Sequence, residues 1–478
     1  MGLFCCCALS VQAIRPNILL IVSEDNGPEL GCYGDPYVQT PVLDRLAAEG
    51  VRFSNAYVPQ AGCSQSRAAL LTGLYPHQNG QIGLATWKFR LFHEETPNLV
   101  RRLHKAGYRT GIVGKLHVNP ASAFPFDFKA IPGSNFARKD LHEYALQAKT
   151  FMNVTEGPSF LSVNFPDAHR PFLKAVEGRP KNPLTAATVK PLSYFGIDSP
   201  NLREQTANYY NCLNRLDGLV GDLLQVLEDS GKAANTLVIY MGDHGADLLR
   251  GKRTSYEGGL RIPLIIRWPE KNGWGLEGRV VSSLVSTLDL MPTRLRVAHA
   301  SWVDGLAGRS LLPLLRDEKA SWRRYLFTEY HLHSAHNFYP QRSIRDERFK
   351  LIWNLFPGEV NPGFDFTNQR FFPGLTKVIA TAPKHVRKAY ARMRIPQEFE
   401  LYDLLNDPHE FRDLSRDSEF NESLLRLKKR LGEWRRETAD PLLDRAKLKR
   451  LQAEVMACFE DGVPVKSRLQ LNYTEYLQ

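Results

Sequence analysis

Residues 236–241, Thr-Leu-Val-Ile-Tyr-Met, form a continuous apolar run that leads directly into Gly242-Asp243-His244-Gly245. A run of this length is typical of a strand buried on both faces, as in a mostly parallel sheet between helices. Four further runs have the same character, and most of them also lead into polar, reactive side chains. These runs span residues 17–22, 110–113, 160–165 and 263–268.

Three segments between the runs, residues 40–49, 96–106 and 201–229, fit crossover helices. Strands that alternate with helices predict an α/β fold with a large, mostly parallel central sheet flanked by helices. In such sheets, ligands bind beyond the carboxyl ends of the strands. The polar clusters that follow the runs all fall there, so they could converge on one site.

The pattern changes after about residue 320. Strands of a smaller antiparallel sheet are predicted at residues 325–330, 342–353 and 399–404. Residues 357–383 are rich in Pro, Gly, Phe and Asn and predict a long loop. We therefore expect a catalytic domain over residues 14–320 and a smaller α+β subdomain over residues 321–478.

Residues 1–13 predict a signal peptide, because residues 3–11 are apolar and Val11-Gln12-Ala13 resembles a small-residue cleavage site. We expect a secreted or periplasmic protein, or one of a lysosome-like compartment in a eukaryote; an unusual cytoplasmic N-terminus is the alternative. No uncharged apolar run reaches the roughly 18–20 residues of a membrane span, so none is expected.

The cysteines outside this leader show neither the paired spacing of a zinc site nor a dense disulfide framework. One disulfide among them stays open, and the sequence does not pair it. These cysteines are Cys32, Cys63, Cys212 and Cys458.

The formal net charge is +11, which favours acidic partners such as nucleic acid, anionic membranes or anionic polysaccharides. Much of the excess lies in residues 424–450, which predict an amphipathic helix with a solvated basic face. Nothing in the chain resembles a known nucleic-acid module, so no nucleic-acid partner is expected.

Two acidic clusters follow predicted strands: the pair Glu24-Asp25, and Asp243 with His244 beside it. Clustered carboxylates offer the hard oxygen ligands that a divalent cation needs. Each carboxylate taken singly is more often a helix cap or a solvated loop group. Their equivalent places at strand ends favour a metal site.

Four basic or titratable side chains stand at strand ends or in the following loops: Lys115, His117, His169 and Lys252. A sulfate or phosphate ester needs cations around its oxygens and a proton donor for its leaving group. A lone Lys is usually solvated and a lone His usually structural, so only the four side chains together indicate a site for such an ester.

Cys63-Ser64-Gln65-Ser66-Arg67 leads into a predicted helix that starts near Ser66. Residues four apart share a helix face, so Arg67 could point back toward Cys63. The free N–H groups of a helix N-terminus suit an anion, and a nucleophile that handles anions would be well placed here. The alternative is a small buried cysteine near a surface arginine.

This pentapeptide and the following Leu70-Leu71-Thr72-Gly73 resemble the sulfatase signature Cys-x-Pro/Ala-x-Arg with its trailing Leu-Leu-Thr-Gly. Further stretches of this chain resemble sulfatase motifs and follow one another in the family's order over some 400 residues. The chain is therefore identified as a member of the sulfatase family of the alkaline phosphatase superfamily. The resemblance implies an alkaline-phosphatase-like fold. Its other carriers include Arg15-Pro16-Asn17-Ile18-Leu19, Gly111-Ile112-Val113-Gly114-Lys115, Tyr256-Glu257-Gly258-Gly259 and Leu401-Tyr402-Asp403.

The resemblance also implies a mechanism in which Cys63 is oxidised to formylglycine by a maturation enzyme and hydrated to a diol. One hydroxyl attacks sulfur and releases the alcohol or amine; the second loses its proton, and sulfate is expelled. Arg67 would orient the diol, and His117 would be the base of the second step. Lys115 and Lys252 would bind sulfate oxygens, and His169 would bind the substrate or protonate the leaving group.

By the same resemblance, residue 63 and four side chains would hold one divalent cation: Glu24, Asp25, Asp243 and His244. Calcium is the expected ion; His244 stands where many sulfatases have Asn, so manganese and zinc are alternatives. Glu24 replaces the usual Asp, and Gln65 stands where maturation enzymes usually read Pro or Ala.

Further stretches resemble the heparan N-sulfatase branch of the family, among them His77-Gln78-Asn79-Gly80 and Phe124-Pro125-Phe126-Asp127-Phe128. They imply removal of an N-sulfo group from glucosamine of heparan-type glycosaminoglycans, in an exo-acting pocket. A 6-O- or other carbohydrate sulfatase, or a phosphodiesterase of the superfamily, is one alternative; a sulfated-glycan-binding protein with unconverted Cys63 is another. The oligomeric state stays open, with a homodimer among the options.

Overall fold

The computed structural model describes residues 15–269 and 276–478, so the signal peptide expected over residues 1–13 lies outside the described part. Its main feature is a nine-stranded sheet in the order β4-β3-β5-β1-β6-β7-β2-β8, with β9 paired to β2. The strands are β1 Asn17–Ser23, β2 Val51–Tyr57, β3 Arg109–Gly114, β4 Phe128–Ala130, β5 Ser159–Phe165, β6 Thr236–Gly242, β7 Arg261–Arg267, β8 Arg279–Val281 and β9 Val285–Ser286.

The centre of this sheet is parallel, because β1 pairs in parallel with both β5 and β6, and β3 pairs in parallel with β4 and β5. β7 runs antiparallel to β6 and β2. The prediction of a large, mostly parallel sheet is confirmed. All five apolar runs of the sequence fall on its strands, except that Trp268 follows the end of β7.

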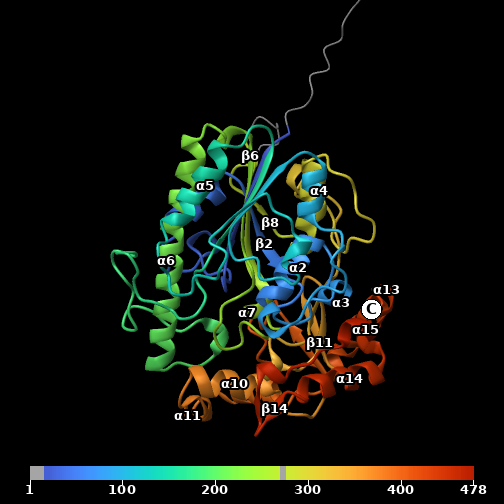
Figure 1. Ribbon diagram of the computed structural model, residues 1–478. Helices are drawn as coiled ribbons and strands as arrows, with labels where there is room; N and C mark the ends of the chain where they lie inside the picture. Colours follow the sequence, from blue (N-terminus) through green and yellow to red (C-terminus); the bar gives the residue numbers. More distant parts are fainter. Residues whose placement is uncertain (1–14, 270–275) are drawn as a thin grey trace, which may run out of the picture.

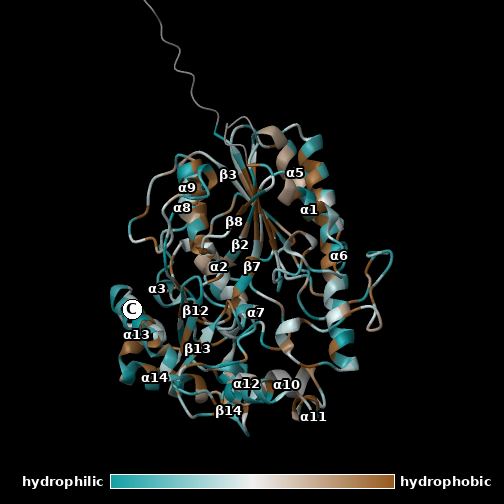
Figure 2. Cartoon of the chain, turned by 180° about the vertical axis from the view of Figure 1, so that it is seen from behind, coloured by the Kyte–Doolittle hydropathy of each residue, from teal (hydrophilic) through white to brown (hydrophobic). Residues whose placement is uncertain are grey.

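Helices cover both faces of the sheet (Figure 1). On β1, Ile18 and Leu20 belong to one core, and Leu19 and Ile21 belong to the other, as the two-residue period of a strand requires. The strands between the helix layers are coloured as hydrophobic in Figure 2. The first core includes α2 Cys63–Thr72, α4 Leu99–Lys105 and α8 Leu290–Val297; the second includes α1 Pro41–Ala48, α5 Glu143–Asn153 and α6 Pro200–Asp229.

A second, antiparallel sheet follows in the order β10-β11-β12-β13, which confirms the smaller sheet expected after residue 320. Residues 342–353, predicted as one strand, form a hairpin instead. Asp346 closes its turn by accepting hydrogen bonds from the backbone N–H groups of Arg348 and Phe349. The strands are β10 Leu326–Tyr330, β11 Gln341–Arg345, β12 Phe349–Asn354 and β13 Phe399–Asp403.

The long loop predicted over residues 357–383 is wrong, because this segment contains α10 Pro362–Phe371 and α11 Leu375–Ala380. Pro362 is the first residue of α10, and Gly374 takes a φ of +80° directly before α11. Proline suits a first helical turn, and glycine suits a left-handed position. Pro and Gly therefore mark the ends of helices here.

The single basic helix predicted over residues 424–450 is also wrong, because two helices, α13 Asn421–Glu437 and α14 Arg445–Met456, occupy it. The chain breaks at Ala439, with a φ of 53°, and at Pro441. No described helix is both long and apolar enough to cross a bilayer. The remaining α-helices and strands of the described residues are α3 Pro76–Asn79, α7 Glu257–Leu260, α9 Leu312–Arg316, α12 Lys384–Arg394, β14 Phe459–Glu460, β15 Val463–Pro464 and α15 Tyr473–Tyr476.

Candidate active site

The predicted site residues gather beyond the carboxyl ends of four neighbouring parallel strands. Glu24 and Asp25 follow β1, whereas Cys63 is the first residue of α2. Lys252 lies in the loop before α7. The others follow β3, β5 and β6: Lys115 and His117, His169, and Asp243 and His244, respectively.

Carboxylates and Cys63 form a compact cluster. One ligand atom each from Glu24, Asp25, Cys63 and His169 lie within 4.8 Å of one another, and the same holds for Cys63, Asp243 and His244. Since the two groups share Cys63 and supply oxygen, sulfur and nitrogen donors around it, the cluster can hold a divalent cation.

The raised pKa values of two buried carboxylates are also consistent with a cation site. Burial raises the pKa of Glu24 to about 7 and that of Asp25 to about 6, because charged carboxylates are costly in this dry place. Glu24 Oε1 is buried and has no hydrogen-bond partner among the described residues. A cation would satisfy this oxygen and lower the pKa of both carboxylates.

The Cys63 thiol lies in an electropositive environment. It is 1% exposed, and its Sγ lies 3.3 Å from Nε2 of His244. Burial opposes ionisation, but the charges of Lys115, Lys252 and His244 lower the pKa of Cys63 well below its usual value. A group attached at residue 63 would therefore be stabilised in an anionic form.

Arg67 is buried within the site. Its Nε donates to Oδ2 of Asp243 at 3.1 Å, and its Nη1 donates to Oδ1 of Asn164 at 2.8 Å and to the Lys115 carbonyl at 2.9 Å. The guanidinium thus ties α2 to the ends of three strands. This arrangement contradicts the alternative of a surface arginine beside a structural cysteine.

The two lysines each contact one of the acidic residues after β1. Lys115 Nζ donates to Oε2 of Glu24 at 2.8 Å, and Lys252 Nζ lies 2.9 Å from Oδ1 and 3.1 Å from Oδ2 of Asp25. Burial opposes the charge on Lys252, but Asp25 raises its pKa above the usual value. Lys252 is therefore a fixed cation beside residue 63.

His117 and His169 are held as neutral imidazoles. Burial and then Lys115 lower the pKa of His117 to about 4, and burial and then Lys252 lower the pKa of His169 well below its usual value. His169 Nδ1 lies 2.5 Å from the Arg170 carbonyl oxygen. A carbonyl only accepts, so Nδ1 carries the proton and Nε2 is left as an acceptor.

His333 also belongs to the site, although the sequence argument missed it. It follows β10 of the second sheet, and its side chain lies close enough to the Cys63 thiol for the thiol to influence its pKa. Burial lowers its pKa to about 3, and Nε2 is buried with no hydrogen-bond partner among the described residues. One signal was present, because His331-Leu332-His333 follows a predicted strand as the other candidates do.

A pocket of about 720 Å³ opens beside this cluster and is lined by both halves of the chain. His169 and Lys252 lie in its wall together with His333. Trp87 and Phe172 add aromatic surface, and further cations come from Arg170 and Arg253. Such a pocket suits a polar ring that carries negative charge.

Gln65, at the variable position of the signature, has a structural role. It is buried, and its Nε2 donates to the carbonyls of Leu332 at 2.6 Å and Ile82 at 3.2 Å. It therefore fixes the loop that carries His333. All four described cysteines are free, so the disulfide left open by the sequence is absent from the described residues.

Known proteins resemble this chain along most of its length. The Sulfatase family model matches residues 16–300, and the model named N-sulphoglucosamine sulphohydrolase, C-terminal, matches residues 242–368. N-sulphoglucosamine sulphohydrolase of Homo sapiens is 35% identical over 91% of this chain and 94% of that protein. An ulvan-active sulfatase of Formosa agariphila is 28% identical over 90% of this chain and 81% of that protein.

Solved structures agree on the fold. A protein in complex with its substrate D-glucosamine-2-N,6-O-disulfate superimposes with a TM-score of 0.66 at 22% identity, over 89% of this chain and 98% of that one. This likeness confirms the predicted fold, and the sequence matches confirm the predicted family. The chain belongs to the sulfatase family, and thus to the hydrolases of the alkaline phosphatase superfamily.

Proposed function

We propose that this sulfatase removes the N-sulfo group from a glucosamine unit of heparan-type glycans, with a formylglycine hydrate at residue 63 as nucleophile. The observation that carries the proposal is the position of Cys63 at the start of α2, beside Lys115, Lys252 and His244. The choice of substrate is supported by the name of the human relative and by the name of the family model that matches residues 242–368 of this chain.

A divalent cation completes the site. Glu24, Asp25, Asp243 and His244 would hold it together with residue 63, as their clustered donor atoms allow. When bound, the cation lowers the pKa of the hydrated residue 63 and offsets the charge of the sulfo group. Calcium remains the proposed ion, and the imidazole of His244 keeps manganese and zinc as alternatives.

The side chains around residue 63 have separate tasks. Lys115 and Lys252 bind sulfo oxygens, because carboxylates hold their ammonium groups in the neighbourhood of Cys63. Arg67 positions residue 63 by fixing the start of α2 against Asp243. The neutral His117 is the base that receives the hydroxyl proton when sulfate leaves.

His169 and His333 lie where the leaving group would sit, in the wall of the active-site pocket. Cleavage of the S–N bond leaves the electron pair on nitrogen, which needs a proton to depart as an amine. With Nδ1–H bound to the Arg170 carbonyl, Nε2 of His169 takes up the proton that the attacking hydroxyl of residue 63 loses and passes it to the departing nitrogen.

Burial of Cys63 constrains its maturation. At 1% exposure, the thiol is out of reach of an enzyme acting on the folded chain. A formylglycine-generating enzyme therefore acts before α2 packs. Maturation before folding is compatible with the proposed secreted, periplasmic or lysosome-like location.

The test is a peptide mass spectrum over residue 63 of protein from its native host, with Cys63→Ser as the control. The proposal expects an aldehyde in place of the thiol in the wild type and an unmodified serine in the variant. An unmodified thiol would sink the formylglycine mechanism and favour a glycan-binding protein without catalysis.

Substrate assays separate the remaining alternatives. The proposal expects hydrolysis of N-sulfoglucosamine to exceed that of glucosamine 6-sulfate and of a phosphodiester by at least about 100-fold in kcat/KM. Preference for the 6-O-sulfated sugar or for the phosphodiester would replace the proposed substrate and leave the family assignment intact.

A further inference from the structure

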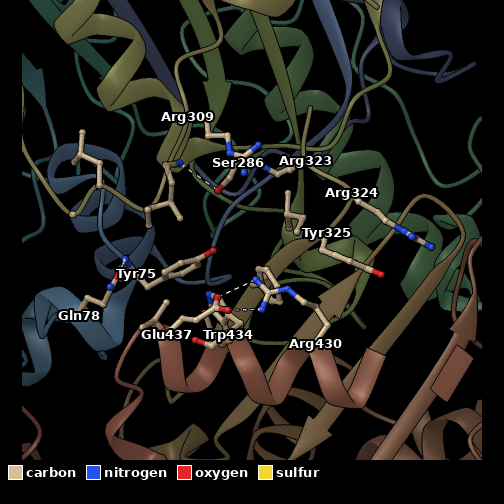
Figure 3. A pocket seen from close by; sticks show the side chains of 17 residues that line it. Tyr75, Gln78, Ser286, Arg309, Arg323, Arg324, Tyr325, Arg430, Trp434 and Glu437 are labelled. Atoms are coloured by element: carbon tan, nitrogen blue, oxygen red, sulfur yellow. Dashed lines mark hydrogen bonds and ion pairs between the residues drawn. The ribbon is translucent and has the colours of Figure 1, made fainter. Parts of the chain in front are cut away.

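A second pocket lies between the two sheets, and none of its lining residues lines the active-site pocket. It encloses about 390 Å³, within the roughly 300–1,000 Å³ of small-molecule sites. Its walls come from Tyr75 beside α3, the segment from β9 to Arg309, the start of β10 and the C-terminal half of α13 (Figure 3).

Four arginines surround this second pocket: Arg309, Arg323, Arg324 and Arg430 (Figure 3). Arg430 is neutralised by a bidentate ion pair with Glu437, with both N–O distances at 2.9 Å. The side chains of Arg309 and Arg324 are exposed, and no ion pair joins them to any acid of the described residues. The pocket therefore keeps positive charge that the protein itself does not neutralise.

The buried carboxylate of Asp289 fixes the part of the wall that carries Arg309 and Arg323. Asp289 accepts hydrogen bonds from the backbone N–H groups of Ser286 at 2.8 Å and Arg309 at 2.7 Å, and from Nη1 of Arg323 at 2.8 Å. The loop that carries Arg309 is thus fixed by a group with no exposure. Preorganised donors bind an anion with a smaller loss of entropy than mobile ones.

The part of the wall around Trp434 is aromatic. The Trp434 ring stacks on Phe327 at a centroid distance of 5.0 Å and meets Tyr75 edge-on at 5.0 Å. The Tyr75 hydroxyl points into the pocket, toward the part of the wall that carries Ser286 and Arg309 (Figure 3). Arg324 lies 5.3 Å above the Tyr325 ring. The pocket thus combines apolar ring surface with guanidinium groups.

We propose that this second pocket binds an anionic sugar unit of a sulfated glycan, distinct from the unit that is hydrolysed. Guanidinium forks match sulfate and carboxylate groups, and aromatic edges and faces pack against the apolar surface of a sugar ring. The inference rests on the proposed function only in taking the glycan as the substrate.

The experiment measures binding of a heparin-derived decasaccharide to the full chain by titration calorimetry. Replacing the two unpaired guanidiniums in the double variant Arg309→Ala/Arg324→Ala should raise Kd at least about tenfold, because charge-assisted hydrogen bonds are lost. Hydrolysis of monomeric N-sulfoglucosamine should keep its kcat/KM within about twofold, since neither residue lines the active-site pocket.

The matched control is Lys129→Ala/Lys149→Ala, which removes the same charge from exposed positions on β4 and α5. It should leave Kd within about twofold, and the charge-conserving Arg309→Lys/Arg324→Lys should recover part of the affinity. A loss in the control equal to that in the arginine variant, or no loss in either, overturns the proposal.

Inorganic sulfate separates a sugar site from a plain anion site. If sulfate alone binds the wild type as tightly as the decasaccharide does, and Arg309→Ala/Arg324→Ala loses that sulfate binding, the pocket holds an ion and the proposal fails. Arginine-dependent binding of the decasaccharide without hydrolysis of N-sulfoglucosamine would refute the proposed function and leave the second pocket standing.

Discussion

At the scale of single residues, the contacts of Arg67 predict a large effect of a charge-conserving change. Arg67→Lys cannot reproduce the three bonds from Nε and Nη1 to Asp243, Asn164 and the Lys115 carbonyl. We expect kcat/KM toward N-sulfoglucosamine to fall by at least about 100-fold. Steady-state kinetics with a thermal melt of the same preparation checks this expectation.

A second buried arginine supplies the control. Arg294 donates from Nε and Nη2 to the carbonyls of Leu290 and Leu70, away from the site. Arg294→Lys should lower stability by about 1–3 kcal/mol and leave kcat/KM nearly unchanged. If it lowers kcat/KM as strongly as Arg67→Lys does, the activity loss at Arg67 reflects general destabilisation.

The cation can be tested through stability, without reference to activity. Because Glu24 and Asp25 are buried with raised pKa values, a cation that binds them should stabilise the folded chain. At a free concentration 100-fold above Kd, the gain is about 2.7 kcal/mol. Thermal melts of chelator-treated protein, with calcium, manganese or zinc restored singly, measure the gain and rank the ions.

Asp243→Asn should abolish most of this cation-dependent shift, because Asp243 contributes to the ligand cluster. Asp198→Asn changes an exposed acid that pairs with Arg203 outside the site, and should leave the shift intact. An equal shift in all three proteins would point to non-specific ion binding.

At the scale of elements, the loop after β10 ties the second sheet to the first through His331. Its Nδ1 donates to Oε1 of Gln60 at 3.1 Å, and its Nε2 accepts from Nη2 of Arg342 at 3.1 Å. This pairing requires a neutral ring. Burial and then Arg342 lower the pKa of His331 to about 3.

The lowered pKa of His331 makes the free energy of unfolding depend on pH. Between the ordinary value near 6.5 and about 3, the unfolded chain binds a proton at His331 and the folded chain does not. The free energy of unfolding should therefore fall as pH drops through this window, by on the order of 4 kcal/mol at its lower end. Urea unfolding from pH 7 to pH 4 measures the slope.

His331→Gln retains one donor and one acceptor but does not titrate, so its unfolding free energy should vary less with pH. His93→Gln, at an exposed position, should keep the wild-type slope. A wild-type slope in His331→Gln would assign the acid sensitivity to other groups.

The elements also show what could be read from the sequence. The strand ends that carry Glu24 and Asp243 were predictable, because long apolar runs and the polar residues after them are local signals. Pro362 and Gly374 led to the wrong prediction of a long loop, because proline and glycine occur at the starts of helices as well as in loops. His333 was not predicted, because its place beside Cys63 depends on how the second sheet packs against the first.

At the scale of the whole molecule, the two sheets share cores rather than touching at a surface. Ala69 and Leu288 of the first part pack in one cluster with Ile344 and Leu431 of the second. Another cluster joins the segment around Phe89 to α14 and α15. We therefore propose that residues 14–320 and 321–478 are two structural units of one folding unit.

Backbone hydrogen bonds cross the same boundary: Glu329 N–H donates to the Pro59 carbonyl at 2.8 Å, and Leu84 N–H donates to the His333 carbonyl at 2.9 Å. A chain ending at residue 320 loses these bonds and leaves the apolar surface around Ala69 uncovered. It should show no cooperative thermal transition, whereas the full chain should unfold in a single calorimetric transition. Two separate transitions in the full chain, or a cooperative melt of the shortened one, would show that the first unit folds without the second. The active site would then be assembled by docking, and His333 would reach Cys63 only after the two units had folded separately.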